Sequence, residues 1–252
     1  MSSYQAVRPI DRNDMSSDRF LSGFNALQSR TLFCLWTGNE IMSDNRLRAI
    51  WTIFSNTGCA VAFINSDTIS EWVKPEFPLH PAFPYLSSTH KSDYLRCYLM
   101  HHYGGGYTDI KLTTKKWGEF FDQLENTDKF ALGYTELPHG IPHIEGEFGD
   151  LLRKSHAELI GLCAFIFKKN TPLTERWLEQ TERLLDAKLA LLLQHPARHP
   201  QDQAGVVLPN GEKSNYPLRW AELLGEIFHP LIFKFRDRLL KAPIEPIFGG
   251  YR

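Results

Sequence analysis

The chain has 252 residues, of which 42% are hydrophobic and 23% charged, and its formal net charge is −1. This length and composition allow one full α/β core to be buried, and they exclude a largely disordered chain. The near-neutral charge argues against a broad nucleic-acid surface, which needs an excess of positive charge, so no nucleic-acid partner is expected.

The start of the chain lacks the apolar run of a secretory signal or a membrane anchor. Residues 1–30 mix Ser, Asp, Arg and Asn, which predicts an N-terminal arm followed by one domain over residues 31–252. No stretch is long enough to span a bilayer. The cysteines are scattered and form no CxxC pair: Cys34, Cys59, Cys97 and Cys163. Their placement is typical of buried thiols in a cytosolic protein.

Two apolar runs flank a helical segment at the start of this domain. Residues 31–36 predict a buried strand, residues 45–55 a helix and residues 59–65 a second strand. A strand, a helix and a strand in this order favour a parallel sheet. The proline-rich residues 74–86 predict a stiff connector, and a Ser or Thr at 87–89 is available to cap the helix that follows.

The most informative stretch is residues 91–111, in which three glycines at 104–106 join a predicted helix to a predicted strand. Asp93 and Arg96 stand three residues apart, so they share one face of the helix, and the guanidinium can fork onto an anion. The glycines end the helix and would let the main chain approach a ligand.

The segment after the glycines carries a carboxylate and an ammonium. Residues 107–110 predict a strand whose alternation sends Ile110 to one face and Asp109 and Lys111 to the other. A charged pair is therefore expected at a strand end, which is where open α/β sheets bind ligands.

These residues resemble GT-A glycosyltransferases: family 32, the capsular-polysaccharide transferases and the glucosylating bacterial toxins. Those enzymes carry a Ser-Asp-x-x-Arg helix, then glycines and a Tyr-x-Asp-x-Asp motif. The matching residues are Ser92, Asp93, Arg96, Gly105, Gly106, Tyr107 and Asp109. The chain departs from the pattern at Lys111, where the families usually have the second Asp. The resemblance implies an α/β, GT-A (Rossmann-like) fold with a mostly parallel central sheet flanked by helices.

The resemblance also implies a donor site for a nucleoside diphosphate sugar. Asp93 and Arg96 would contact the transferred sugar, and Asp109 would contact the ribose, the sugar or a metal ion. The first strand ends in Trp36, which in the resembled enzymes stacks on the nucleotide base. The substrate-binding set then includes Thr37, Gly38, Ser92, Gly105, Gly106, Tyr107 and Lys111.

Because Lys111 stands in place of the second Asp, the sequence leaves open whether the site binds a divalent metal ion. The resembled enzymes hold Mn²⁺ or Mg²⁺ with the Asp-x-Asp pair, and the ion offsets the negative charge of the leaving diphosphate. Either Asp109 holds the ion with help from elsewhere in the chain, or Lys111 neutralises the diphosphate and no metal is needed. A third outcome is a fold that has lost its activity.

Beyond the motif, the sequence predicts a helix over residues 117–124, a strand over 130–134 and an irregular loop over 135–156. Because long loops in compact domains are often functional, this loop is expected to face the acceptor. Its candidate polar groups are Glu136, His139, His143, Glu145 and Glu147. A zinc pair of the two histidines is not expected, because Gly140 and Pro142 disfavour the helix that would align them.

The last third predicts core elements and a basic tail. Residues 157–167 predict a buried strand, and Thr171 caps an amphipathic helix reaching Leu193. A linker over residues 195–216 precedes a helix over 218–227. The section from 195 to 252 could form a lid over the donor site or touch an anionic membrane surface through its basic residues. These are Lys234, Arg236, Arg238 and Lys241.

The function predicted from these features is transfer of a hexose from a nucleoside diphosphate sugar to a glycan, lipid-linked or protein acceptor. The resemblance favours a retaining enzyme of bacterial surface polysaccharide synthesis, in the cytoplasm or peripheral at the inner face of the membrane. The alternatives are a catalytically silent GT-A-like scaffold protein and a metal-dependent hydrolase built on the 139–147 loop. The sequence does not indicate an oligomeric state.

Overall fold

A computed structural model describes residues 30–38 and 41–250. The predicted N-terminal arm lies outside the described residues, apart from Arg30. The strands are β1 (Thr31–Trp36), β2 (Ala60–Asn65), β3 (Gly105–Thr108), β4 (Ala131–Thr135), β5 (Ile160–Phe167) and β6 (Leu239–Lys241). The α-helices are α2 (Asp44–Asn56), α3 (Ser88–His102), α4 (Gly118–Glu125), α5 (Glu147–Lys154), α6 (Pro172–Gln194) and α7 (Gly225–Lys234).

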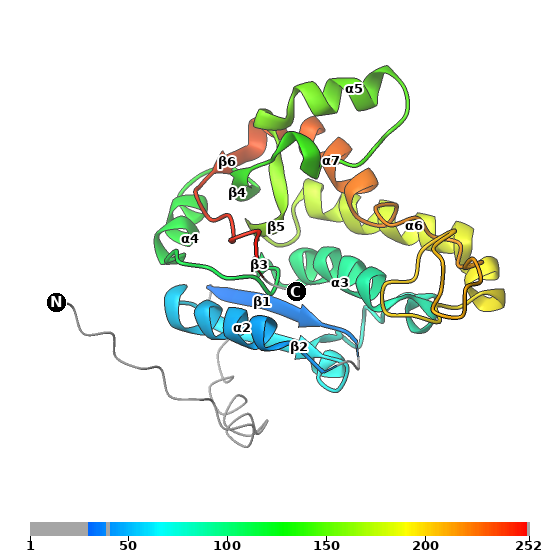
Figure 1. The fold of residues 1–252 in the computed structure, drawn as a ribbon. Coiled ribbons are helices and arrows are strands. Elements are labelled where there is room, and N and C mark those ends of the chain that lie inside the picture. Colours follow the sequence, from blue (N-terminus) through cyan, green and yellow to red (C-terminus); the bar gives the residue numbers. More distant parts are fainter. Residues whose placement is uncertain (1–29, 39–40, 251–252) are drawn as a thin grey trace.

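The six strands form one sheet in the order β2-β1-β3-β5-β4-β6, with helices on both of its faces (Figure 1). β1 pairs in parallel with β2 and β3, and β4 pairs in parallel with β6. β5 runs antiparallel to its neighbours β3 and β4. The predicted α/β class with a mostly parallel sheet flanked by helices is therefore confirmed, and the arrangement is consistent with a GT-A-like fold.

The residues of β1 pack alternately into two hydrophobic clusters, one on each face of the sheet. Leu32 and Cys34 pack with the apolar sides of α2 and α4, whereas Phe33 and Leu35 pack in the cluster that contains α3 and α6. Successive strand residues point to opposite faces, and both faces of this sheet are covered. The run is consequently hydrophobic throughout instead of alternating.

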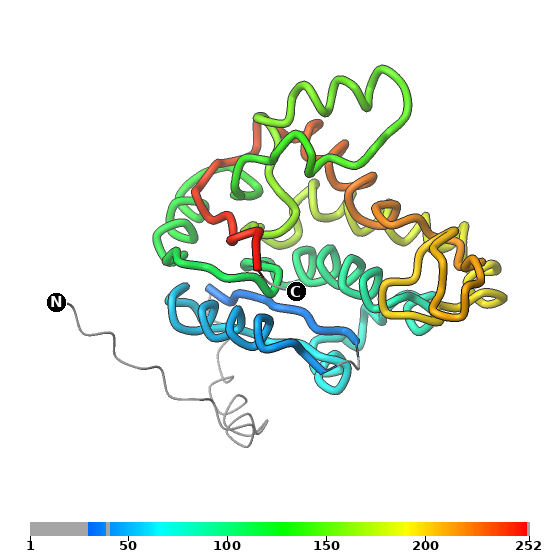
Figure 2. Tube along the Cα trace, in the orientation of Figure 1, coloured from blue at the N-terminus to red at the C-terminus, as the bar shows by residue number. Residues whose placement is uncertain are grey.

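Helix α3 begins and ends as its sequence predicts. Ser87 is the N-cap and accepts a hydrogen bond from the backbone N–H of His90. The helix stops before Gly104, whose φ of +68° suits a residue without a Cβ. Figure 2 shows the segment 195–224, in gold, beside the start of α3, and the backbone N–H of Thr89 donates to Pro200 O at 3.1 Å. The end of α3 nearest the site is thereby held by a distant part of the chain.

Two of the glycines after α3 allow β3 to pack closely against β1. Their predicted second role, the approach of the main chain to a ligand, stays a prediction. A Cβ at Gly105, whose φ is +94°, would lie 2.7 Å from Thr31 O, and one at Gly106 would lie 2.9 Å from Leu32 Cδ1. Both glycines already belong to β3 and pair with β5. The strand therefore spans 105–108 and not 107–110, and Asp109 lies just beyond it.

Two further boundaries differ from the sequence prediction. The predicted irregular loop over 135–156 contains α5, whose Leu152 is buried and whose Asp150 and Arg153 pair across one turn. The predicted helix over 218–227 begins at Gly225 and continues through Pro230 to Lys234. In both places packing of apolar residues against the rest of the fold outweighs the local signals of Gly and Pro.

We predict that Gly105→Ala destabilises the protein far more than Gly58→Ala. Both glycines have a positive φ, but a Cβ at Gly58 would meet nothing within 4 Å. Gly58→Ala should cost about 1–2 kcal/mol from backbone strain alone, and Gly105→Ala roughly 2–5 kcal/mol because the clash with Thr31 O adds to that strain. Urea unfolding of both variants measures the difference, and equal losses would contradict it.

Candidate functional site

A pocket of about 320 Å³ lies at the carboxyl ends of β1 and β3. The chain leaves β1 toward β2 on one side and later returns to form β3 on the other, so the two strands flank a topological switch point. Ligands in open α/β sheets bind at such points. The pocket walls come from the end of β1, the first turn of α3, the segment after β3, Arg46 of α2 and the segment 195–224.

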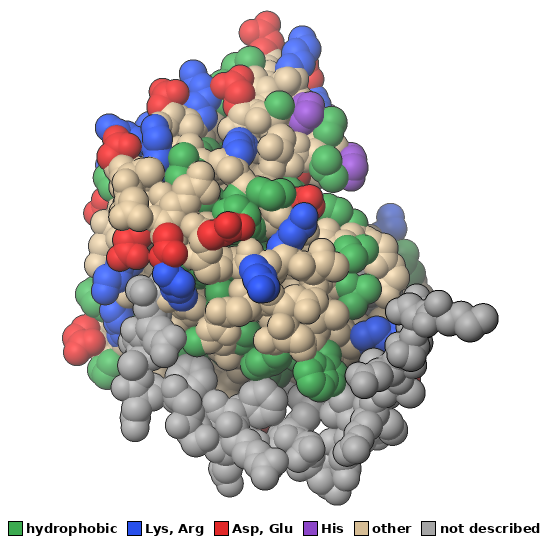
Figure 3. All heavy atoms as spheres, turned by 90° about the vertical axis from the view of Figure 1, so that its left-hand side faces the viewer, with side chains coloured by type: hydrophobic (Ala, Val, Ile, Leu, Met, Phe, Trp, Pro, Cys, Tyr) green, Lys and Arg blue, Asp and Glu red, His purple; other side chains and the backbone are tan. Residues whose placement is uncertain are grey.

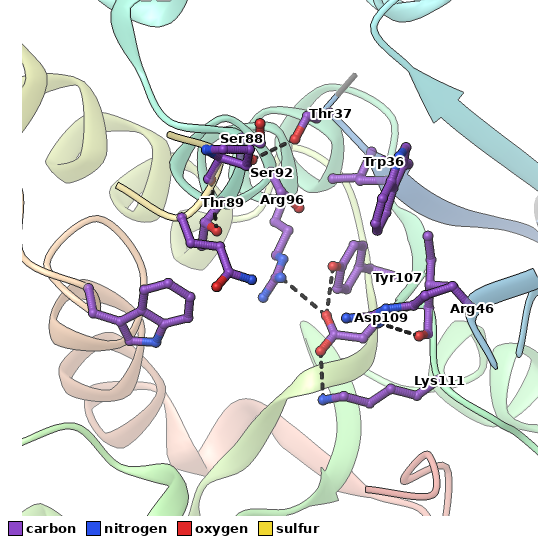
Figure 4. Close-up of a pocket in the computed structure, with 16 residues that line it drawn as sticks. Trp36, Thr37, Arg46, Ser88, Thr89, Ser92, Arg96, Tyr107, Asp109 and Lys111 are labelled. Carbon is purple, nitrogen blue, oxygen red and sulfur yellow. Dashed lines mark hydrogen bonds and ion pairs between the residues drawn. The ribbon is translucent and has the colours of Figure 1, made fainter. Parts of the chain in front are cut away.

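The end of β1 contributes Trp36, Thr37 and Gly38 to the pocket, and their role in binding a substrate stays a prediction. The Thr37 hydroxyl donates to Ser88 O at 2.5 Å, which joins β1 to the start of α3. The Arg46 guanidinium lies 6.0 Å from the centre of the Trp36 ring. An indole and a cation therefore stand together at one side of the pocket, as Figure 4 shows.

Asp109 is the centre of the polar side chains in Figure 4. Its Oδ1 accepts hydrogen bonds from Arg96 Nη2 at 3.1 Å and from the Tyr107 hydroxyl at 2.8 Å. Its Oδ2 accepts from Lys111 Nζ at 2.9 Å. The carboxylate thus holds two cations from different elements in fixed positions.

The guanidinium group of Arg96 contacts an aromatic ring, a carboxylate and a backbone carbonyl. Its guanidinium lies 4.5 Å from the centre of the Tyr107 ring, and its Nη2 is 3.8 Å from Asp93 Oδ1. Nη1 donates to Leu162 O at 3.4 Å, whereas the buried Nε has no hydrogen-bond partner among the described residues. Asp93 is only 3% exposed and does not line the pocket. The predicted group of Asp93, Arg96 and Asp109 does converge, with Asp93 behind the guanidinium.

The pKa shifts separate the two carboxyl groups. Burial opposes the charge on Asp109, but Arg96 and Lys111 outweigh it and hold its pKa well below the ordinary value. Burial raises the pKa of Asp93 to about 7, against the opposing effect of Arg96. Burial also opposes the charge on Lys111, yet Asp109 raises its pKa above the ordinary value. Asp109, Arg96 and Lys111 are all charged at neutral pH.

The described residues that line the pocket carry an excess of positive charge. Arg46, Arg96 and Lys111 are basic, and Asp109 is their acidic counterpart. This excess is local, because the chain as a whole is nearly neutral, and acidic and basic side chains are interspersed on the face in Figure 3. The pocket is therefore suited to an anion that also offers an aromatic or apolar surface.

Several lining residues were missed by the sequence interpretation. They are Leu35, Arg46, Ser88, Thr89, Ile110, Pro200, Gln201 and Trp220. Arg46 had a detectable signal, since it lies in the first turn of α2, the next helix after the Trp36 strand. Trp220 lies in the section 195–252 that was considered as a lid, but no local pattern singled it out, because its segment reaches the pocket only through tertiary packing.

The predicted acceptor-loop residues are not brought to this pocket. Glu136 is buried, and its Oε2 lies 2.9 Å from Nε2 of the buried His229. The exposed ones are His139, His143, Glu145 and Glu147. None of the five lines the pocket, and Gly105 and Gly106 do not line it either. Their binding roles stay predictions.

The donor set does not fit a divalent metal ion. Both oxygens of Asp109 already accept hydrogen bonds from Arg96, Tyr107 and Lys111. Within residues 30–38 and 41–250, no group of three or more His, Cys, Asp or Glu side chains could hold a metal ion. Lys111 stands beside Asp109 where a second carboxylate ligand would be needed.

The basic residues near the end of the chain mostly contact the protein itself. Arg236 pairs with Glu158 at 3.1 Å and Arg238 pairs with Asp128. Lys241 donates to Leu159 O. Over the part of the chain that the structure describes, no helix has both the length and the apolar character needed to cross a bilayer. Contact with a membrane surface stays a prediction.

Comparison with known proteins gives structural likeness but no match in sequence. No protein-family model matches the chain, and no curated protein matches it. Five chains of solved structures match, among them "PaToxG Glycosyltransferase", with a TM-score of 0.38 and 14% identity. That match covers 66% of this chain and 64% of the other. A likeness at this level assigns neither a family nor an activity.

We predict that Asp93→Asn changes how stability depends on pH. Because the folded pKa is raised from 3.8 to about 7, the folded protein holds a proton that the unfolded chain releases, and wild-type stability falls as pH rises through this window. Asp109 adds no slope there, since its pKa is lowered and its contribution is complete above about pH 5. Asparagine cannot ionise, so the variant lacks this pH dependence. From pH 5 to pH 8 the free energy of unfolding of the wild type should fall by about 2 kcal/mol relative to that of the variant.

Urea unfolding at pH 5, 6, 7 and 8 measures this difference. Asp67→Asn, at an exposed carboxylate, is the matched control for loss of an acidic group. Parallel pH profiles for wild type and Asp93→Asn would show that Asp93 does not titrate in this range.

Proposed function

We propose that this protein is a glycosyltransferase that binds a nucleoside diphosphate sugar in the pocket between β1 and β3. The observation that carries the proposal is the Asp109 carboxylate held between Arg96 and Lys111, opposite the Trp36 indole at a switch point of the sheet. These residues are also the ones that resemble the GT-A transferases. An anion-binding wall and an aromatic surface are what the two halves of a nucleotide require.

Each wall of the pocket has a role in this proposal. Trp36 offers a flat surface for the base. The diphosphate lies against Arg46, Arg96 and Lys111. These three positive charges outnumber the single negative charge of Asp109 in the pocket lining. The first two turns of α3 also face the pocket through Ser88, Thr89 and Ser92, and the positive end of a helix dipole favours a bound anion.

The same geometry supports a step that breaks the bond between the sugar and the diphosphate. Negative charge develops on the leaving diphosphate, and cations that are already in place stabilise it without reorganising. Asp109 holds Arg96 and Lys111 in position before the donor arrives. Asp93 contacts the Arg96 guanidinium from behind, with its Oδ1 3.8 Å from Nη2.

The finer parts of the proposal rest on the motif resemblance. They are transfer of a hexose, retention of the anomeric configuration, a glycan, lipid-linked or protein acceptor, and a role in bacterial surface polysaccharide synthesis. The same proposal includes a location in the cytoplasm, either free or bound peripherally to the inner face of the membrane. It is supported by the four cysteines, all of which are free thiols.

Calorimetric titration with UDP, GDP and dTDP and their sugar conjugates tests the donor site. At least one nucleotide should bind, and Trp36→Ala should weaken that binding about 10- to 100-fold, since stacking of a base on an aromatic ring contributes about 1–3 kcal/mol. Trp51→Ala, at a half-exposed indole of α2 outside the pocket, is the matched control. Lack of binding by every nucleotide would refute the donor site.

We also propose that the donor diphosphate is neutralised by Lys111 and Arg96 without a divalent ion. Nucleotide affinity should be the same in EDTA and in Mn²⁺. Lys111→Met should lower the affinity about 10- to 100-fold, since a hydrogen bond to a charged group contributes about 1.5–3 kcal/mol. The exposed Lys116→Met removes the same charge outside the pocket and should change little. Binding that requires Mn²⁺ would contradict this assignment.

A second candidate function is a catalytically silent sugar-nucleotide-binding protein. The observation that favours it is that both oxygens of Asp109 already accept hydrogen bonds from side chains of the protein. Donor hydrolysis or transfer that Asp109→Asn abolishes, in a variant that still unfolds cooperatively, would exclude the silent protein. Nucleotide binding without any turnover would favour it.

A further inference from the structure

The segment 195–224 places an exposed indole at the pocket. Trp220 lines the pocket and is 46% exposed. Within the described part of the chain its ring makes no contact with another aromatic ring and lies over no cation. A large apolar ring left open beside a charged pocket is a feature that marks binding surfaces.

The backbone just before Trp220 is held by a buried histidine of α3. His90, which is fully buried in α3, has its Nε2 3.1 Å from Arg219 O and its Nδ1 2.9 Å from the Tyr216 hydroxyl. The rings of His90 and Tyr216 also stack, with centres 5.5 Å apart and planes inclined by 22°. The backbone that bears the indole is therefore fixed to α3 by hydrogen bonds and ring stacking.

The surroundings of Trp220 differ from the anion-binding wall. The segment 195–224 contributes Pro200, Gln201 and Trp220 to the lining, and none of these is charged. Thr89, at the start of α3, lies in the same lining. Arg219, next to Trp220, is turned to Glu222 and Glu226 and does not line the pocket. The chemistry here is an aromatic face with an amide and a hydroxyl, and without cations for a phosphate.

A sugar ring matches this chemistry. One face of a pyranose presents C–H groups, which pack against an indole, while its hydroxyl groups need hydrogen-bond partners such as amides and hydroxyls. Binding sites commonly combine an apolar wall of this kind with a few polar groups that orient the ligand. A nucleotide base could also stack on an indole, but the cations that must meet its diphosphate are supplied by Arg46, Arg96 and Lys111 from other elements.

We propose that Trp220, with Gln201 and Thr89, forms a saccharide subsite within the same pocket, beside the donor site, and that the acceptor of this protein is a glycan. That the bound saccharide is the acceptor rests on the proposed transferase function. The existence of the subsite rests only on the residues named here. The acceptor subsite is thus built by the segment 195–224 and not by the 135–156 loop.

A glycan array probed with the full-length protein tests the subsite, followed by calorimetric titration of the strongest array glycan. Trp220→Ala should weaken glycan binding at least tenfold, while UDP, GDP or dTDP affinity stays within twofold of wild type. Trp220→Phe keeps an aromatic face and should retain part of the glycan affinity. Trp51→Ala, at an indole that is 50% exposed on α2, should behave as wild type.

Three outcomes would overturn the subsite: no array glycan binds the wild-type protein, Trp220→Ala binds glycans as wild type does, or Trp220→Ala loses nucleotide and glycan binding together. The last would place Trp220 in the donor site. Glycan binding that depends on Trp220 in a protein that binds no nucleotide would refute the proposed transferase function and still support the subsite.

Discussion

The candidate site depends on one carboxylate. Asp109 lies directly after β3 and accepts hydrogen bonds from Arg96 and Lys111, so two cations that would otherwise repel each other share a small, partly buried space. Taking charges out of water is costly unless they are paired with good geometry. The short path from β3 to Lys111 and the rigid α3 supply that geometry, and the rest of the pocket is arranged around it.

The backbone places this carboxylate through close packing. β3 can lie against β1 and turn toward the pocket because Gly105 leaves room for Thr31 O. The Thr37 to Ser88 hydrogen bond and the contact of Thr89 with Pro200 then fix the start of α3 relative to β1 and to the segment 195–224. Three distant parts of the sequence thereby meet around one pocket, which combines cationic and aromatic side chains.

Much of the site was predictable, because its central residues are close together in sequence. The spacing of Asp93 and Arg96 predicted that they share one face of a helix, and the resemblance to GT-A transferases implied that Asp109 joins them at one site. Spacing could not predict that Asp93 is buried behind Arg96, because that depends on what packs over the helix. Nor could it predict that the 135–156 polar residues stay away from the pocket, since a loop's direction is decided by its contacts.

The amino-acid sequence by itself determined the α/β class, the positions of β1, α2, β2, α3 and α6, and the charged motif at a strand end, because local periodicity, caps and glycines specify these. Only the tertiary structure decided that β5 runs antiparallel and that Arg46 and Trp220 join the pocket. Those features arise from contacts between residues far apart in the chain, and no local pattern records which distant segments will pack together.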